Sequence, residues 1–348
     1  MKFLTRTYYF SLLIVGLMLA QDIVAQTEPM YSQYMYNMLS INPAYAGSRE
    51  VLSMNMFHRK QWVGIAGAPQ TTSITMDQSF NDKKVGLGIQ MYDDRLGVEK
   101  AQGVNAMWSA RVRVSENGIL SGGLQFGAMN YRADLTKVEN RFTPGDPAFT
   151  QNYSKWLPSV GLGLFYNTDK FYIGASMPNL MRTRLATFDM IKSGIRNVND
   201  MHFFATAGYV YAINEQVKFK PSAMVKVVSG APIQYDFNAN FWLKDMIGFG
   251  VSYRTKDAVL GMIELQANRN FRIGYAYDIP ISDLKLYTIG THEIMLRYEF
   301  SKDKTNIKCV PGVTTRVIAL RTRPFACLGS SIWSQMATLC PCWTRRAR

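Results

Sequence analysis

Along most of the chain, apolar and polar residues alternate with a period of two. Between residues 291 and 300, for example, Ile294 and Leu296 alternate with the charged Arg297 and Glu299. Strict alternation is typical of β-strands whose two faces meet different surroundings, so it predicts strands rather than helices. About fourteen such segments occur, each roughly ten residues long, the length at which a tilted strand crosses a bilayer. The predicted strands lie near residues 51–58, 70–78, 84–93, 102–114, 118–130, 157–167, 169–177, 202–213, 216–228, 232–243, 245–255, 257–267, 269–279 and 291–300.

The predicted connections differ in length on the two sides of the sheet. The connections after even-numbered strands are all short, and one of them contains the turn-forming pair Asn117-Gly118. Outer-membrane barrels have short periplasmic turns and longer external loops, and an even strand number returns both ends to one side. The pattern therefore predicts an all-β fold, a transmembrane antiparallel β-barrel of the outer-membrane type, with both termini in the periplasm. The long connections all follow odd-numbered strands and cover residues 58–69, 131–156, 178–201 and 280–290.

A soluble β-sandwich is the main alternative, because its strands also alternate when one face packs against a core. Uniform strand length and one-sided long connections favour the barrel instead. Aromatic residues near strand ends also favour it, since such residues form girdles at membrane interfaces. These aromatic residues are Tyr92, Trp108, Tyr131, Tyr166, Tyr211, Trp242, Tyr253, Tyr277 and Tyr298.

The first residues have the pattern of a secretory signal. Lys2 and Arg6 precede an uncharged apolar run over residues 8–20, and small residues follow. This run is too short for a comfortable membrane span, so residues 1–25 are predicted to be a signal peptide, cleaved after Ala25 or, alternatively, after Ala20. Residues 26–50 are then expected to form a periplasmic leader before a barrel over residues 51–300.

The last residues differ in composition from the rest of the chain. All four cysteines lie beyond residue 308, and residues 301–348 carry nine Lys and Arg but a single acid, Asp303. About +8 of the formal charge of +14 therefore belongs to this tail, and the body is only mildly basic. We interpret residues 301–348 as an atypical basic, disordered tail, either frameshifted or a genuine periplasmic extension. No clustered basic face or recognition motif points to nucleic acid.

No residue pattern assembles an active site, a cofactor site or a metal site. The Gly-x-Gly pairs, such as Gly86 with Gly88, lie in the middle of strands, where no helix N-terminus follows to bind phosphate. Glycine on an inward strand face is instead expected to ease barrel curvature. The three histidines are far apart in the sequence, and Asp93, Asp94 and Glu99 do not have the spacing of a calcium loop. We therefore expect a protein that is not an enzyme.

Several separated motifs near the start resemble the PorP/SprF family of Bacteroidetes, outer-membrane proteins of the type IX secretion and gliding system. They are the segments 31–37, 41–47, 59–64 and 67–69, and the last strand, 292–300, is also similar to that family's. The resemblance covers about residues 26–308 and implies a barrel of about fourteen strands. The residues that carry it and that we single out are Tyr31, Ser32, Gln33, Asn42, Pro43, Ala44, Gly47, Arg59, Gln61, Trp62, Gly67 and Pro69.

These family-motif residues have two interpretations, either plugging and bracing the barrel or contacting a partner. The resemblance implies a non-enzymatic outer-membrane component that supports secretion or surface attachment of adhesin-like proteins and gliding. Its implied partners are subunits of the secretion machinery, the C-terminal domain of a secreted adhesin and outer-membrane lipid. The alternative function is a diffusion channel or small-solute transporter, which the inward-facing residues Arg254, Arg272 and Asp278 would allow.

Overall fold

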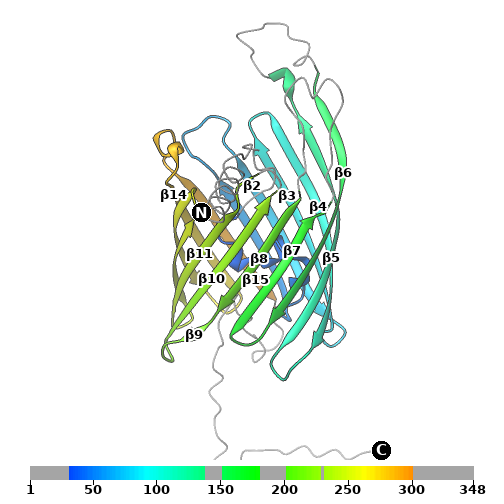
Figure 1. The fold of residues 1–348 in the computed structure, drawn as a ribbon, viewed down its shortest axis with the longest axis vertical. Helices are drawn as coiled ribbons and strands as arrows, with labels where there is room; N and C mark the ends of the chain where they lie inside the picture. Colours follow the sequence, from blue (N-terminus) through cyan, green and yellow to red (C-terminus); the bar gives the residue numbers. More distant parts are fainter. Residues whose placement is uncertain (1–30, 138–150, 181–200, 229–230, 301–348) are drawn as a thin grey trace, which may run out of the picture. The chain divides into compact units, whose positions relative to one another are not determined.

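The computed structural model describes residues 31–137, 151–180, 201–228 and 231–300. The predicted signal peptide and the tail from residue 301 lie outside the described residues. Within them, one antiparallel sheet closes on itself through pairing of β1 with β15 (Figure 1). The strands are β1 (Leu52–Lys60), β2 (Gln70–Phe80), β3 (Val85–Leu96), β4 (Glu99–Arg113), β5 (Ile119–Ala133), β6 (Tyr153–Asn167), β7 (Phe171–Asn179), β8 (His202–Tyr209), β9 (Tyr211–Ala212), β10 (Val217–Val228), β11 (Gln234–Leu243), β12 (Ile247–Arg254), β13 (Ala258–Gln266), β14 (Phe271–Pro280) and β15 (Thr291–Phe300).

The predicted barrel of fourteen strands is confirmed. β8 and β9 are two parts of one strand, because both pair with β10 in the same register, Gly208 opposite Ser222 and Tyr211 opposite Phe219. Their interruption falls opposite Pro221, which has no N–H to donate to the sheet. None of the helices among the described residues is long and apolar enough to cross a membrane.

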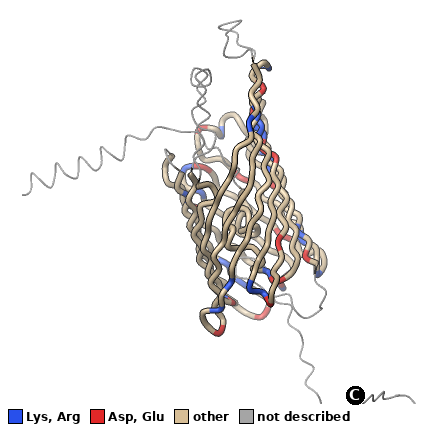
Figure 2. Tube along the Cα trace, turned by 90° about the vertical axis from the view of Figure 1, so that its right-hand side faces the viewer, with Lys and Arg blue, Asp and Glu red and all other residues tan. Residues whose placement is uncertain are grey.

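The period-two pattern separates an apolar outer wall from a polar inner wall. In β5, Leu124 and Phe126 are exposed outward, whereas Ser121 and Gln125 are buried inside. Many of the charged residues lie toward the two ends of the barrel (Figure 2). An apolar outer band with a polar interior is the arrangement that lipid around a barrel requires.

Strand length is less uniform than the sequence predicts. β4, β5 and β6 each have 15 residues, whereas most other strands have 8 to 12. The predicted connection 131–156 is therefore shorter, because β5 continues to Ala133 and β6 begins at Tyr153. The inner side of this tall hairpin has its own apolar cluster of Met129, Tyr131, Ala133, Leu135 and Leu157.

Residues 31–50 were expected as a leader that precedes the barrel, and they lie inside it instead. We call residues 31–50 the luminal segment. It folds into three short 3-10 helices, η1 (Tyr34–Tyr36), η2 (Met38–Ser40) and η3 (Pro43–Tyr45), drawn in blue within the wall in Figure 1. Every residue of the segment is buried except Ser40 and Glu50, which are half-buried. The lumen is therefore occupied by the chain's own N-terminal part.

The luminal segment begins toward one end of the barrel and finishes at the other. We call the end with the β1–β2 and β14–β15 connections the long-connection end, and the opposite end the short-turn end. Ser32 contacts Asp278 and Glu293, two or three residues from the long-connection end of β14 and β15. Glu50 instead pairs with Lys83, in the tight turn between β2 and β3. The segment thus descends through the lumen before the chain enters β1.

Candidate functional site: the filled lumen

The first residues of the luminal segment are held by charges from β1, β14 and β15, an arrangement that we call the upper clamp. The Arg59 guanidinium donates to Asp278 (2.8 Å) and Glu293 (3.1 Å) and also to the Ser32 hydroxyl. The Glu293 carboxylate accepts the backbone N–H groups of Ser32 (2.7 Å) and Gln33 (2.8 Å). All of these groups are almost fully buried, which strengthens charge-assisted hydrogen bonds.

The upper clamp also joins the strands that close the barrel. Arg59 belongs to β1, Glu293 to β15 and Asp278 to β14, so Arg59 bridges the β1–β15 seam. A second buried arginine, Arg254 of β12, pairs with Asp236 of β11 at 3.1 Å and lies 3.9 Å from Asp278. The charges around the start of the luminal segment therefore form one connected network.

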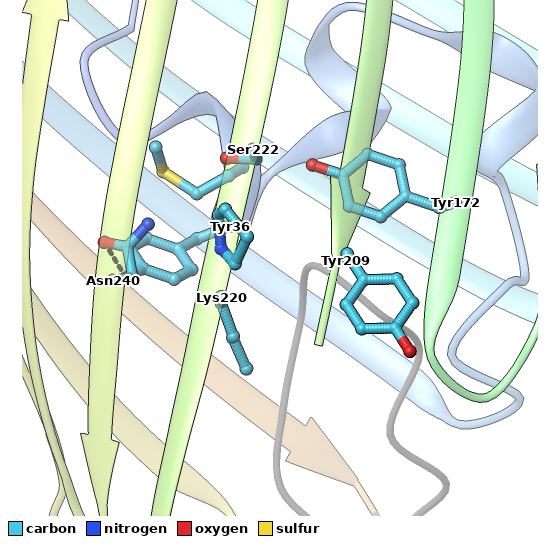
Figure 3. Close-up of a pocket in the computed structure, with 8 residues that line it drawn as sticks. Tyr36, Tyr172, Tyr209, Lys220, Ser222 and Asn240 are labelled. Carbon is cyan, nitrogen blue, oxygen red and sulfur yellow. Dashed lines mark hydrogen bonds between the residues drawn. The ribbon is translucent and has the colours of Figure 1, made fainter. Parts of the chain in front are cut away.

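The middle of the lumen is packed with aromatic and apolar side chains from the segment and the wall. In Figure 3, Tyr36 lies against β10 and β11, and its hydroxyl donates to Asn240 at 3.3 Å. The cavity beside it, lined by Met35, Lys220 and Pro221 among others, has a volume of about 10 Å³, room for about one water molecule. The packed cluster includes Tyr31, Tyr34, Met35, Tyr36, Met38, Leu39, Tyr45, Phe57, Phe165, Tyr172 and Phe204.

Glycines on the inner wall give the luminal segment the space it occupies. A Cβ added to Gly123 would lie 2.2 Å from the Ala44 nitrogen, and one added to Gly86 would lie 1.9 Å from the Ala46 carbonyl oxygen. At Gly163 the added Cβ would lie 2.1 Å from the Asn42 side chain. Close approach of backbone is a recognised use of strand glycine. At these positions the close approach of the luminal segment is a reason for glycine beyond the expected easing of curvature.

Asn42 fixes the backbone where η3 begins. Its side-chain oxygen accepts the Ala44 N–H (2.9 Å), which caps the helix, and its amide donates to the Leu164 carbonyl of β6 (3.0 Å). Pro43 occupies the first helical position, where its missing N–H is not needed. The motif residues Asn42, Pro43 and Ala44 therefore form a capped turn that is bonded to the wall.

The last residues of the luminal segment are held mainly by arginines, in what we call the lower clamp. Arg49 pairs with Glu299 of β15 and donates to the Tyr36 carbonyl at 3.1 Å. Arg297 of β15 donates to the same carbonyl and, at 2.6 Å, to Asn55 of β1. The lower clamp therefore also bridges the seam between β1 and β15.

The turn at the end of the luminal segment is likewise bonded to β2. The Gly47 N–H donates to the Asp77 carboxylate at 2.9 Å. Gly47 has φ of +72°, a left-handed conformation that glycine adopts without strain, and an added Cβ would meet Gly86 at 2.8 Å. A glycine is therefore required here on two independent grounds.

The family-motif residues fall into two groups in the structure. Arg59, Gln61, Trp62, Gly67 and Pro69 lie at the end of β1 and in the connection to β2. The Gln61 N–H donates to the Pro69 carbonyl (2.9 Å), and the Trp62 N–H donates to the Thr291 hydroxyl (3.1 Å). The other group lies in the luminal segment and comprises Tyr31, Ser32, Gln33, Asn42, Pro43, Ala44 and Gly47. Arg59 links the two groups through the Ser32 hydroxyl.

The inward charges considered for a channel are neutralised by neighbours on the wall. Arg272 pairs with Glu264 at 2.8 Å. Arg254 pairs with Asp236, and Asp278 pairs with Arg59. Sequence reasoning did not single out Asp236, Glu264 or Glu299 as partners. The sequence offered one signal for them, because the alternation along each strand places them on its inner face. A charged residue on that face needs a buried partner.

Among the described residues, no group of three or more His, Cys, Asp or Glu side chains is placed to hold a metal ion. Asp93, one of the acidic residues considered for a cation, pairs with Arg95 at 2.7 Å and Lys100 at 3.2 Å.

Comparison with solved structures finds other barrels at low similarity. A Pseudomonas aeruginosa FadL homologue has 11% identity over 81% of this chain and 100% of its own, with a TM-score of 0.43. The Ralstonia pickettii toluene transporter TbuX has 10% identity over 81% and 97%, with a TM-score of 0.45. The CymD monoaromatic hydrocarbon channel has 12% identity over 80% and 95%, also with a TM-score of 0.45. Likeness at this level carries no argument about function.

Comparison with protein families, unlike comparison with solved structures, assigns the chain to one family. No curated protein sequence matches the chain significantly. The family described as type IX secretion system membrane protein PorP/SprF matches residues 23–298, which include the luminal segment and nearly all of the barrel. The luminal segment and the residues of the two clamps, except Glu299, therefore lie within the matched region. This chain is a member of the PorP/SprF family of type IX secretion system membrane proteins.

Proposed function

We propose that this protein is a closed, non-enzymatic outer-membrane component that supports secretion or surface attachment of adhesin-like proteins by the type IX system. The observation that carries the proposal is the filled lumen within a barrel of this family. A barrel whose interior is a packed core offers its surfaces to other proteins rather than its lumen to solutes. The expected partners are subunits of the secretion machinery or the C-terminal domain of a secreted protein.

The packing of the lumen supports a permanent plug rather than an open channel. Burial of a large apolar side chain contributes roughly 1.5–3 kcal/mol, and the luminal segment buries several tyrosines, methionines and leucines. Withdrawal of the segment would also leave the carboxylates of Asp278 and Glu293 beside an empty lumen. Opening a solute path would therefore break the core and the upper clamp together.

The one-sided connections support an orientation for this proposal. With the long connections outside and the short turns in the periplasm, β15 ends on the periplasmic side. The surface available to an external partner then contains the 61–69 connection, where Gln61, Trp62, Gly67 and Pro69 lie. Periplasmic subunits would meet the short-turn end, where the luminal segment joins β1.

Gene deletion with complementation tests the role in secretion. The deletion strain is expected to lose surface adhesins and gliding, and the intact gene is expected to restore both. If secretion, surface adhesins and gliding all persist without the gene, the proposed function is wrong.

Single-channel recording in planar bilayers tests the closed lumen separately. The purified full chain is expected to show no steady conductance, whereas a persistent open state would favour the channel. A variant with Gly123→Ala, which crowds the luminal segment at Ala44, is expected to leak if it inserts. Gly261→Ala is the matched control, because an added Cβ there meets nothing within 4 Å.

A further inference from the structure

Among the strands that the structure describes, β6 has a neighbour on just one side over its first residues. On that side, β5 pairs with all 15 residues of β6. On the other side, β7 pairs with β6 as far as Leu162, and the Leu180 N–H then donates to the Val160 carbonyl at 2.8 Å. β6 extends beyond the end of β7 at the right of Figure 1. We call its residues 153–159 the free edge.

The path of β7 leaves this edge without a neighbour. The register of β7 with β8 shifts before Asn179, and Pro178 has no N–H with which to continue the pairing. The Asn179 side chain is buried and accepts the hydroxyl of Ser159, an inward residue of β6, at 2.8 Å. A Cβ added to Gly161, also an inward residue, would lie 2.4 Å from the Pro178 carbonyl oxygen. The end of β7 therefore bends over the inner face of β6 instead of lying beside it.

Alternate residues of the free edge direct their backbone groups away from β5. Val160 directs its carbonyl to the β7 side, and the register between β5 and β6 has no shift along the strand. Ser154, Trp156 and Pro158 follow at alternate positions, so their backbone groups point to the same side. The edge therefore presents the N–H groups of Ser154 and Trp156 and the carbonyls of all three. Within the described part of the chain, no backbone bond to these groups is formed.

The free edge lies beyond the apolar outer band of the neighbouring strands. On the outer face, Asn130 of β5 lies opposite Trp156, and Gln102 of β4 lies opposite Asn130. Gln102 donates to Asp93 of β3 at 2.7 Å, so the row of residues at this height is polar. Unpaired backbone groups are costly in lipid, and a position beyond the apolar band leaves them available to another chain.

We propose that the free edge of β6 binds an extended strand of another protein, which adds to the sheet as the missing neighbour. Main-chain hydrogen bonds then provide affinity, and alternating side chains provide specificity. The Trp156 side chain, 67% exposed, offers a large apolar contact on the outer face. Lys155 is exposed on the opposite face. The matching strand therefore carries an apolar residue beside Trp156 and an acidic residue beside Lys155.

A second copy of this chain fits the free edge less well than a different protein does. Copies in the same membrane share one orientation, so their β6 strands would run in the same direction. β6 pairs antiparallel with both β5 and β7, and parallel pairing is slightly less stable per residue. A strand from a different protein can adopt the antiparallel direction.

The position of the free edge selects between the two kinds of partner given under Proposed function. β5 and β6 are connected at the long-connection end, like β1 and β2. With the long connections outside the cell, the partner is an exported surface protein rather than a periplasmic subunit. This choice of partner rests on the proposed function, whereas the free edge itself does not.

Photo-cross-linking in intact cells tests the proposal with matched variants of the full chain. The probe is p-benzoylphenylalanine in place of Trp156, which keeps a large aromatic side chain. Ser154→Pro removes an N–H from the free edge without removing a bond to β5. Ser154→Ala is its control, because both variants lose the hydroxyl that accepts from Asn130 but only the proline loses the N–H. Heat-modifiable mobility on gels confirms that each variant is folded.

The expected result is an adduct with an exported protein, identified by mass spectrometry of the cross-linked peptide. The amount of adduct should fall about tenfold in Ser154→Pro and stay unchanged in Ser154→Ala, since the proline loses a hydrogen bond and places its ring against the added strand. Equal adducts from the two variants would overturn the proposal, as would adducts confined to this chain or to its second copy. If the proline variant does not fold, Lys155→Glu should weaken the adduct relative to Lys155→Arg, and equal adducts from this pair would overturn the proposal.

Gene deletion separates failure of this proposal from failure of the proposed function. If secretion persists without the gene while Ser154→Pro still removes the adduct, the proposed function is wrong and the strand-binding edge stands. If secretion requires the gene but Ser154→Pro and Ser154→Ala give equal adducts, the proposed function stands and the edge does not bind the partner.

Discussion

The two clamps of the luminal segment hold different parts of the backbone. At the upper clamp, carboxylates predominate, and Glu293 accepts the N–H groups of Ser32 and Gln33. At the lower clamp, arginines predominate, and Arg49 and Arg297 donate to the carbonyl of Tyr36. A segment of short 3-10 helices leaves N–H groups free at the start of each turn and carbonyls free at its end. The wall supplies the acceptor Glu293 in one place and the donor Arg297 in the other.

The comparison also shows what holds the barrel closed. Both clamps connect β1 with β15, the strands that are most distant in the sequence. The luminal segment is therefore expected to stabilise the seam in addition to filling the lumen.

The largest expected effect is loss of the upper clamp. Arg59→Ala leaves Asp278 and Glu293 buried with one cation fewer, and removing one partner of a buried pair typically costs about 3–5 kcal/mol. Urea unfolding of the barrel in lipid vesicles, followed by gel mobility, should show this loss. Lys60→Ala, at the exposed neighbouring position, should change little. Equal stability of the two variants would show that the upper clamp does not hold the seam.

The lower clamp is expected to be less sensitive to a single change. Arg49→Ala leaves Glu299 buried, but Arg297 and Arg272 remain nearby and lower the energy of that carboxylate. The expected loss is therefore about 2–3 kcal/mol, less than for Arg59→Ala, in the same unfolding measurement. A larger loss for Arg49→Ala than for Arg59→Ala would reverse the order of the two clamps.

An added methyl group on the wall between the two clamps is expected to loosen the luminal segment rather than the strands. Gly123→Ala places a methyl group 2.2 Å from the Ala44 nitrogen, and overpacking of this kind typically costs about 1–3 kcal/mol. Protease protection of the segment should fall, as measured by mass spectrometry after limited digestion. Unchanged protection relative to Gly261→Ala would show that the segment is not held against β5.

The smallest effect is expected at Trp242, which lies between two cations. Lys220 lies 5.0 Å and Arg272 4.7 Å from the ring centroid. Trp242→Leu removes these cation–π contacts but keeps an apolar side chain, so the expected loss is about 0.5–2 kcal/mol. Trp242→Phe retains part of the cation–π interaction, so its stability should lie between those of the unchanged protein and the Trp242→Leu variant. A Phe variant no more stable than the Leu variant would assign the role of Trp242 to packing alone.

Position along each strand, inward or outward, accounts for much of what was predicted and for specific errors in the predicted girdle. Tyr131 and Trp242 were placed among the aromatic residues that could form an interfacial girdle, yet Tyr131 is 5% exposed and packs in an inward apolar cluster, and Trp242 is 1% exposed and faces the lumen. Its neighbours Phe241 and Leu243 face outward, so alternation already assigned Trp242 to the inner wall. The error arose from weighing residue type above position. Trp108 and Tyr253, which have outward parity, are exposed as expected.

Other features had no local signal in the sequence. The polar residues between Tyr31 and Glu50 are compatible with an exposed leader, and their burial depends on partners more than 200 residues away, such as Glu293 for Ser32. The inward glycines are compatible with strand curvature, and their contact with Ala44 or Ala46 appears only when the segment is in place. The family-motif residues were recognised in advance, but their division between the luminal segment and the 61–69 connection was not.

By itself, the sequence determined the number of strands, the inward and outward faces and the closed antiparallel barrel. These follow from a period-two pattern that is local, because each strand must present apolar residues to lipid. The tertiary structure alone decided that residues 31–50 fill the barrel and that the lumen is a core. Polar side chains and backbone groups can be satisfied by water or by a wall, and only three-dimensional proximity selects between them.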